Sequence, residues 1–198
     1  MRRAILIGLA LMLGTLGGCA TPQAPLGIAD GIVVLPANNL TGDPLLVEGS
    51  GLIDRYIRRA GKVSVGDVLQ SEARFRLQEK GFDVGDWSVQ QAAFAGKVPD
   101  SAQAAAALAR QAGITKRVLY LEIRRWEPDA PTHPRFVIVA LIASVVDPAS
   151  GQEIWREHRQ AAPVATPGSI NAEAAYVVAA RRVIAEVLAP LRPAPLLR

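Results

Sequence analysis

The sequence predicts an α/β (α+β) fold in which a single mixed sheet packs with about three helices. Three observations support this prediction. The early half alternates strand-like and helix-like segments in the order β-α-β-α. Three strand-like segments then follow one another, which is typical of an antiparallel three-strand meander, and a C-terminal amphipathic segment predicts a final helix.

The first predicted strand covers residues 32–35, a run of β-branched and aliphatic residues that a proline ends. Residues 38–44 are rich in turn-forming residues. Residues 45–60 give conflicting signals, because Gly49 and Gly51 disfavour a helix whereas the second half of the segment suits one. The conformation of residues 45–60 therefore stays open.

Residues 64–80 form the clearest helix. Ser64 suits the N-cap position, and Asp67 stands three residues later, as in a capping box. Gly81 marks the end of the helix. The helix has a broad apolar face made of Val65, Val68, Leu69, Ala73, Phe75 and Leu77.

A short strand is predicted at residues 82–84, before a second helix that begins at Asp100 or Ser101. This helix is rich in alanine through Ala112 and ends at Gly113. Alanine allows close packing, so we expect this helix to lie against the sheet.

The later half contains the three consecutive strands. Residues 117–126 alternate, with Leu119, Leu121 and Ile123 on one face and Tyr120, Glu122 and Arg124 on the other. One face should therefore contact water, which favours an antiparallel arrangement. Residues 136–146 are continuously apolar and suit a central strand, and a turn at residues 147–151 leads into residues 152–159. Helical spacing covers residues 171–188.

The N-terminus has the three parts of an export signal. Arg2 and Arg3 are followed by an apolar stretch at residues 4–13 and by small residues that lead to Cys19. The apolar stretch is too short to span a membrane, because a transmembrane helix needs about 20 residues.

The phrase Leu16-Gly17-Gly18-Cys19 resembles the lipobox of bacterial lipoproteins. The resemblance implies cleavage before Cys19, a diacylglycerol on its thiol and an acylated amine. Ala20 replaces the aspartate that retains some lipoproteins in the inner membrane, which implies the periplasmic face of the outer membrane. The alternative is a secretory signal with a chance cysteine.

These features divide the chain into a signal peptide (1–18), a lipidated tether (19–30), a periplasmic α/β domain (31–189) and a proline-rich tail (190–198). Cys19 is the only cysteine, which excludes an intramolecular disulfide. The precursor carries 22 Lys and Arg against 18 Asp and Glu. Removal of Arg2 and Arg3 leaves a nearly neutral chain, which gives no indication of nucleic-acid binding.

Two phrases of the chain resemble a group of periplasmic lipoprotein domains related to CsgG, LpoB and the TolB N-terminal domain. Residues 33–44 read VVLPANNLTGDP, and residues 145–155 read VVDPASGQEIW. The group has a strand ending in Leu-Pro before an Asn-x-Thr-Gly-Asp-Pro loop, and a Gly turn before an aliphatic-Trp pair. Gly49 and Gly51 depart from the group's pattern. The chain also lacks two long alternating segments, so the CsgG pore is not expected.

The sequence contains no recognisable catalytic, cofactor-binding or metal site. His133 and His158 are the only histidines, and a zinc site would need both of them together with carboxylates. Strand geometry places His158 on the opposite face from Glu153 and Glu157. We therefore expect two surface histidines. No Gly-x-Ser-x-Gly elbow and no phosphate-binding glycine motif is present.

Three further features allow more than one interpretation. Glu72 lies in the apolar sector of its helix and could be a buried acid, although a helix edge that reaches solvent is the expected reading. A basic cluster could meet anionic lipids or an acidic partner, or simply be solvated. It consists of Arg55, Arg58, Arg59 and Lys62. The tryptophans Trp87, Trp126 and Trp155 could be interface anchors, and Trp155 could equally cap the core.

The leading functional hypothesis is a non-enzymatic accessory lipoprotein that binds another envelope protein. The alternative is a self-assembling, CsgG-like secretion or export component. A third hypothesis, a hydrolase that acts on envelope material, would require His133 or His158.

Changing Cys19 to Ala tests the lipid anchor. We expect the variant to lose its acyl mass and its membrane retention, because no other thiol can accept the lipid. Intact-mass measurement and membrane fractionation check both results. Normal retention with an unchanged acyl mass would contradict lipidation at Cys19.

Overall fold

The structure is a computed structural model that describes residues 31–48, 62–86, 92–94 and 96–193. Its strands are β1 (Ile32–Val34), β2 (Asn38–Asn39), β3 (Leu46–Glu48), β4 (Lys62–Ser64), β5 (Arg117–Pro128), β6 (Phe136–Val146) and β7 (Glu153–Ala165). Its labelled helices are α1 (Val65–Glu79), α3 (Ala102–Gln111) and α4 (Ala172–Val187).

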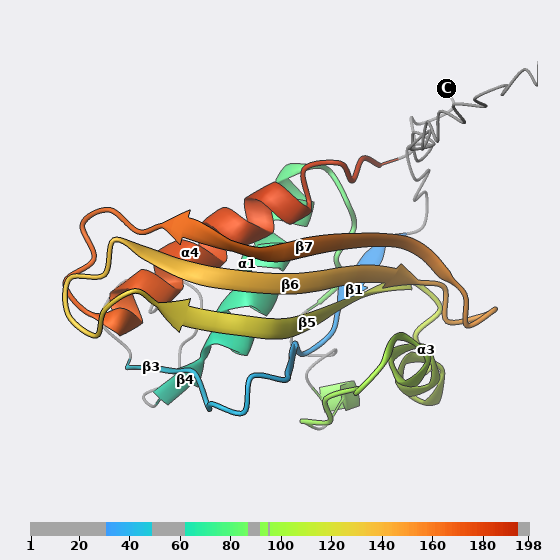
Figure 1. The fold of residues 1–198 in the computed structure, drawn as a ribbon. Coiled ribbons are helices and arrows are strands. Elements are labelled where there is room, and N and C mark those ends of the chain that lie inside the picture. The colour runs from blue at the N-terminus through green and yellow to red at the C-terminus, as the bar shows by residue number, and fades with distance from the viewer. Residues whose placement is uncertain (1–30, 49–61, 87–91, 95, 194–198) are drawn as a thin grey trace, which may run out of the picture.

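One mixed sheet organises the domain, as predicted (Figure 1). The strand order is β1-β5-β6-β7, and β2 also pairs with β5. Both β1 and β2 run parallel to β5, whereas β5, β6 and β7 form an antiparallel meander. β6 is the central strand of the meander, as its continuous apolar sequence predicted. β3 and β4 form a separate two-stranded antiparallel sheet.

Helices α1 and α4 cover one face of the sheet, and we call this the two-helix face (Figure 1). The core here joins alternate residues of β5 and β6 to the apolar sides of both helices. The sheet contributes Leu119, Leu121, Ile123, Val139, Leu141 and Val145, among others, and the helices contribute Leu69, Leu77, Ala179 and Ile184. Burial of this many aliphatic side chains supplies the main driving force for folding.

Helix α3 lies on the opposite face, where it covers only the end of the sheet next to β1 (Figure 1). Ala105, Ala106 and Ala109 of α3 pack here on Val118 and Tyr120. The predicted close packing of this alanine-rich helix is therefore confirmed. The expectation that this face of β5 contacts water is wrong between residues 118 and 123, where every residue is buried.

Side-chain caps fix where each helix begins. Ser64 accepts a hydrogen bond from the Asp67 amide, and the Asp67 carboxylate accepts one from the Ser64 amide, so the predicted capping box is present. Ser101 caps α3, and Asn171 caps α4 in the same way. Each cap satisfies backbone donors that the first helical turn leaves unpaired.

Three sequence predictions need correction. Residues 82–84 are not a strand, because this segment meets β1 through one backbone hydrogen bond, from Ile32 to Asp83, and not through a ladder. Phe75 does not belong to the buried side of α1, since it is 37% exposed and its ring lies beside Arg76. Glu72 is buried, with an exposed fraction of 4%, and pairs with Arg76 at 2.8 Å.

Two predicted boundaries also change. Strand β7 continues to Ala165, six residues beyond its predicted end. Leu191, which falls in the predicted tail, is only 1% exposed and packs on the core. Its carbonyl also accepts a hydrogen bond from Lys80. The chain thus remains attached to the domain for several residues after α4.

Replacing Leu69 by Ala tests the packing of α1 against the sheet. The side chain is fully buried, so we expect the free energy of unfolding to fall by about 2–5 kcal/mol. Urea unfolding followed by circular dichroism measures this change. Phe75→Ala on the same helix is the control and should cost less, because Phe75 is 37% exposed whereas Leu69 is fully buried; equal losses would contradict the assigned packing.

Candidate protein-binding surfaces

The two ends of the sheet differ in what they present. Ile32 pairs with Arg117 at the start of β5, so the chain enters the described domain at this end, which we call the proximal end. The described part of the chain also finishes near this end, after α4 (Figure 1). Strand β5 reaches the opposite, distal end at Pro128. None of the helices within the described residues is long and apolar enough to cross a membrane.

Two loops at the distal end, residues 129–135 and 166–171, are fastened to each other, and together we call them the distal platform. The His133 amide donates to the Ile170 carbonyl, and the Thr166 amide donates to the Arg135 carbonyl. The Thr166 hydroxyl donates to the Pro134 carbonyl at 3.0 Å. Asp129 accepts from the amides of Arg135 and Phe136. These bonds hold the two loops in one arrangement.

The distal platform exposes an aliphatic side chain and a cation. Ile170 is 68% exposed, the largest value among the exposed large hydrophobic residues of the described chain. The side chain of Arg135 is 88% exposed and approaches Asp129 only to 3.8 Å. His133 is also exposed, and its φ of 47° lies in the left-handed region that few non-glycine residues adopt. A strained backbone persists only where surrounding contacts enforce it, which the inter-loop bonds do here.

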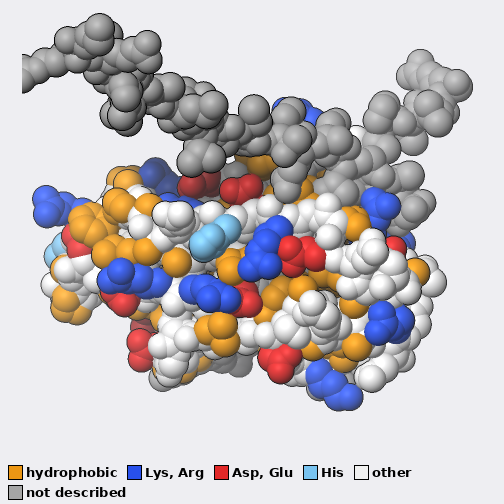
Figure 2. All heavy atoms as spheres, turned by 45° about the vertical axis from the view of Figure 1, so that its right-hand side comes forward, with side chains coloured by type: hydrophobic (Ala, Val, Ile, Leu, Met, Phe, Trp, Pro, Cys, Tyr) orange, Lys and Arg blue, Asp and Glu red, His pale blue; other side chains and the backbone are white. Residues whose placement is uncertain are grey.

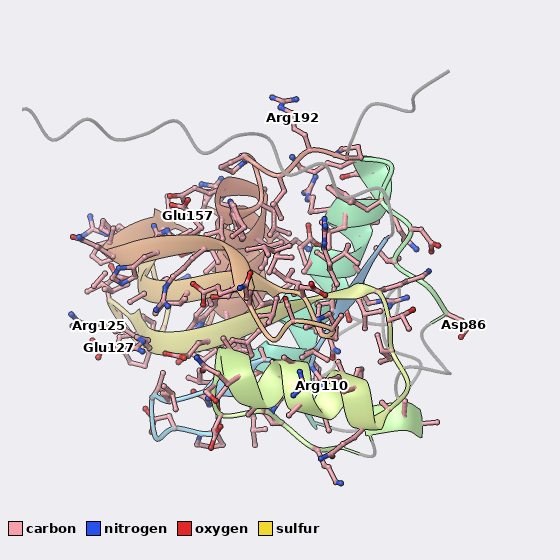
Figure 3. The ribbon with its side chains drawn as sticks, turned by 90° about the vertical axis from the view of Figure 1, so that its right-hand side faces the viewer. Asp86, Arg110, Arg125, Glu127, Glu157 and Arg192 are labelled. Carbon is pink, nitrogen blue, oxygen red and sulfur yellow. The ribbon has the colours of Figure 1, made fainter. Side chains whose placement is uncertain are left out.

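A second surface lies on the α3 side of the sheet, beyond the part that α3 covers. Phe136, Ile138 and Ala140 alternate along β6 on this side and are half-buried. Arg125 and Glu127 of β5 flank them, because Arg125 pairs with Ala140 and Glu127 with Ile138. We call these five residues the open face. Figure 3 shows Arg125 and Glu127 beside each other, on the opposite side of the sheet from α1.

A buried polar network borders the open face. Asn38 of β2 donates to the Tyr120 hydroxyl at 3.1 Å, and this hydroxyl donates to Glu122 at 3.3 Å. Arg124 forms an ion pair with the same carboxylate. Burial raises the pKa of Tyr120 to about 12, and the nearby negative charge of Glu122 acts in the same direction. The network joins the loop after β1 to the centre of β5.

The loop that carries the resemblance to periplasmic lipoprotein domains is organised by its own side chains. The Asn39 carboxamide accepts from the Thr41 amide and donates to the Asp43 carbonyl. The Thr41 hydroxyl accepts from the Asp43 amide. The chain therefore bends at residues 41–43, as the turn-forming residues predicted, whereas Asn38 and Asn39 at the start of the segment form β2.

The two histidines do not form a shared site. His133 lies on the distal platform and His158 on β7, and both are exposed. Glu153 and Glu157, which lie near His158 in the sequence, give no metal site either. Among the described residues, no group of three histidine, cysteine, aspartate or glutamate side chains is placed to hold a metal ion.

A shallow cavity of about 320 Å³ lies between β7 and α4, next to His158. Its most buried polar side chain is Arg159, which is already engaged. Arg159 donates to the carbonyls of Val139 and Ala162 and pairs with Glu186 at 3.2 Å. This arginine therefore bridges the bulge in β7, and its charge is already paired.

The tryptophans, Cys19 and the basic cluster remain to be placed. Trp126 and Trp155 are 2% and 4% exposed, so both belong to the core and neither anchors an interface. Trp126 meets Tyr176 edge to face, with 6.4 Å between ring centroids. Cys19, Trp87 and the arginines of the basic cluster lie outside the described residues. The backbone of Lys62 begins β4.

Neither surface was predicted from the sequence. The exposed position of Ile170 depends on hydrogen bonds between loops that lie more than 30 residues apart in the chain. The open face depends on how much of the sheet α3 covers. A usable signal for the open face was present, because Phe136, Ile138 and Ala140 are apolar and alternate with residues that face the two-helix core.

Changing Tyr120 to Phe tests the buried polar network. We expect a loss of about 1–3 kcal/mol in the free energy of unfolding, because Asn38 and Glu122 lose their shared partner. Tyr176→Phe is the control and should cost less, since its hydroxyl has no hydrogen bond to another described residue.

The same variant has a distinct pH dependence. The folded protein holds the Tyr120 proton more tightly than the unfolded chain, whose pKa is about 10. The contribution of the protonated Tyr120 hydroxyl to the free energy of unfolding is therefore fully present below about pH 10. It falls by about 1.4 kcal/mol per pH unit as the pH rises towards 12. The free energy of unfolding of the wild-type protein should therefore fall over this pH range, and that of Tyr120→Phe should lack this fall. Parallel curves of unfolding free energy against pH, from pH 9 to 12, would contradict the assignment.

No protein-family model and no curated protein matches the chain. Solved structures do share its architecture. A PelC dodecamer from Paraburkholderia phytofirmans, which carries one leucine-to-methionine substitution, matches with a TM-score of 0.51 at 19% sequence identity. The match covers 87% of this chain and 95% of that chain. This likeness shows a common fold.

Weaker likenesses connect the chain with two further proteins. Lipoprotein GNA1162 from Neisseria meningitidis has a TM-score of 0.43 at 18% identity, over 68% of this chain and 78% of its own. The LpoB C-terminal domain from Salmonella enterica has a TM-score of 0.40 at 17% identity, over 72% and 88%. In fold, the chain is similar to PelC.

Proposed function

We propose that this chain is a non-enzymatic accessory lipoprotein of the bacterial envelope, which uses the distal platform to bind another envelope protein. The lipobox-like phrase at Cys19 supports the lipid anchor. The observation that carries the binding role is the exposed Ile170, held on two loops that are fastened together.

The position of the distal platform suits this role. The predicted tether, residues 19–30, reaches at most about 40 Å when fully extended. It joins the domain at the start of β1, beside Arg117. Strand β5 has 12 residues and carries the chain about 40 Å further, to the distal platform. With lipid on Cys19, the membrane would therefore lie towards the proximal end and the distal platform would face away from it.

The exposed groups indicate the chemistry of the partner. Ile170 offers an aliphatic side chain for an apolar pocket, and the exposed Arg135 favours an acidic group beside that pocket. The loops are already ordered by their mutual hydrogen bonds, so binding loses little conformational entropy on this side. The partner that this surface fits best is an envelope protein with an apolar pocket that has acidic residues around it.

Self-assembly is the second candidate function, and the PelC structure favours it, because that protein is a dodecamer. The shared fold makes a many-copy arrangement of this chain a reasonable alternative. The likeness to CsgG and to the TolB N-terminal domain remains a prediction from sequence phrases, as does the outer-membrane location.

Changing Ile170 to Asp tests the proposed partner site. We expect crosslinking of the native protein in membranes, followed by mass spectrometry, to identify an envelope protein that the variant loses. The reason is that a carboxylate cannot enter an apolar pocket without a large desolvation cost. Val98→Asp is the matched control, since Val98 is 50% exposed on the loop before α3 and should retain the partner.

Two results would count against the proposed function. Equal recovery of the foreign protein with Ile170→Asp and wild type would remove the distal platform from the interface. Recovery of nothing except copies of this chain, in a large particle, would favour self-assembly.

A further inference from the structure

The open face leaves an apolar row on the central strand without a covering element among the described residues. Alternate residues of β6 point to this side, starting with Phe136, Ile138 and Ala140. Ile142, the next in the row, is already 4% exposed and lies between Glu122 and His158 in register. On the β7 side, Pro163 and Ala165 pair with this row and continue its apolar character.

The charges around this row are balanced. Arg125 and Glu127 lie two residues apart on β5 and form an ion pair at 2.6 Å. Both are accessible, with exposed side-chain fractions of 44% and 56%. Figure 2, an oblique view that includes this side of the sheet, shows hydrophobic side chains mixed with both signs of charge and no large area of one sign. A second copy of the same surface would therefore meet no net repulsion.

We propose that the open face is a contact between two copies of this chain, related by a two-fold axis. The axis crosses the strands between the row of Arg125 and Ala140 and the row of Glu127 and Ile138. Rotation about it places each Arg125 opposite the Glu127 of the second copy. The same rotation places the small Ala140 opposite the larger Ile138.

This arrangement satisfies what a two-fold contact requires. Such an interface uses the same patch twice, so each group must meet its complement on the same patch. Here one rotation pairs opposite charges and also alternates small and large apolar side chains. Facing sheets pack about 10 Å apart, a separation that interdigitating side chains of this size fill.

The edge of the sheet is a poorer site for the second copy. β7 is the outer strand, and an unpaired strand edge can template pairing with another chain. Its register is interrupted by irregularities, and Pro163 has no amide to donate. Glu153, Arg156 and Glu157 add charges along the strand. Bulges, proline and charge are the features that prevent edge pairing, so the contact falls on the face.

Charge reversal provides the test. The full chain, expressed with its own leader and solubilised from membranes in mild detergent, is compared as wild type, Arg125→Glu and Glu127→Arg by native mass spectrometry and sedimentation. We expect wild type to dimerise and each variant alone to associate roughly tenfold or more weakly, because like charges then face each other. A mixture of the two variants should recover the dimer, since the carboxylate introduced in one copy then meets the guanidinium introduced in the other.

Arg135→Glu is the control for charge reversal outside the open face, and it should dimerise like wild type. All three changes affect exposed side chains, and circular dichroism confirms that each variant is folded. A wild-type monomer would overturn the proposal. So would self-association that survives both charge reversals, or a mixture of the two variants that does not recover the dimer.

This inference is independent of the proposed partner site. The distal platform is tested by Ile170→Asp and the open face by Arg125→Glu and Glu127→Arg. Loss of the foreign partner without loss of the dimer, or the reverse, therefore shows which of the two surfaces has been assigned correctly.

Discussion

The rest of this structure depends on one constraint, which is that β6 is apolar on both of its faces. Its neighbours β5 and β7 are also long, so the three strands together present two broad surfaces that need cover. Helices α1 and α4 bury one surface along its length. Helix α3, with ten residues, is too short to cover the other. The open face is the part of the second surface that remains.

The same constraint explains where polar groups are buried. Near α3 the second surface is covered, so Tyr120 and Glu122 must satisfy their polar atoms internally, which Asn38 and Arg124 allow. Beyond α3 the surface reaches solvent. Arg125 and Glu127 stand there at positions where apolar side chains would be exposed to water. A buried polar network and an exposed ion pair thus mark the boundary of what α3 covers.

Much of the fold could be predicted from sequence because its signals are local. The capping residues Ser64 and Asn171, and the glycine after α1, define helix ends within a few residues of chain. The continuous apolar run of β6 identified the central strand. Turn residues around Asp147 predicted the connection to β7, and Asp147 accepts hydrogen bonds from Ala149 and Ser150 there.

The errors share a different cause, which is that burial is decided by distant elements. Tyr120 alternates with core residues and so resembles a solvent-facing position, but α3 and β2 arrive from elsewhere to cover it. Glu72 is buried because it can pair with Arg76 at the helix surface. Phe75 is apolar but projects from the exposed side of the same helix. The distal platform was not predictable, since its inter-loop bonds have no signature in either loop alone.

Two surfaces with different characters therefore follow from one sheet. The distal platform is small and held together by hydrogen bonds between its loops, and it projects an aliphatic side chain and the exposed Arg135 at the end away from the chain's entry. The open face is flatter and balanced in charge. Rotation about the proposed axis reverses the direction of the strands, so the two copies of a dimer would pack face to face with their distal platforms at opposite ends. The tether of one copy, about 40 Å when extended, would then have to span the length of β5 to reach the same membrane.

The most direct test of how the second surface of the sheet is covered is hydroxyl-radical footprinting of the full, detergent-solubilised chain at low and high concentration. Phe136 and Ile138 should be reactive when the chain is dilute and become protected as its concentration rises. Phe75, on the outer side of α1, should not change. Protection of Phe75 without protection of Phe136, or constant reactivity of Phe136 and Ile138, would contradict the claim that the uncovered half of the sheet is completed by a second copy.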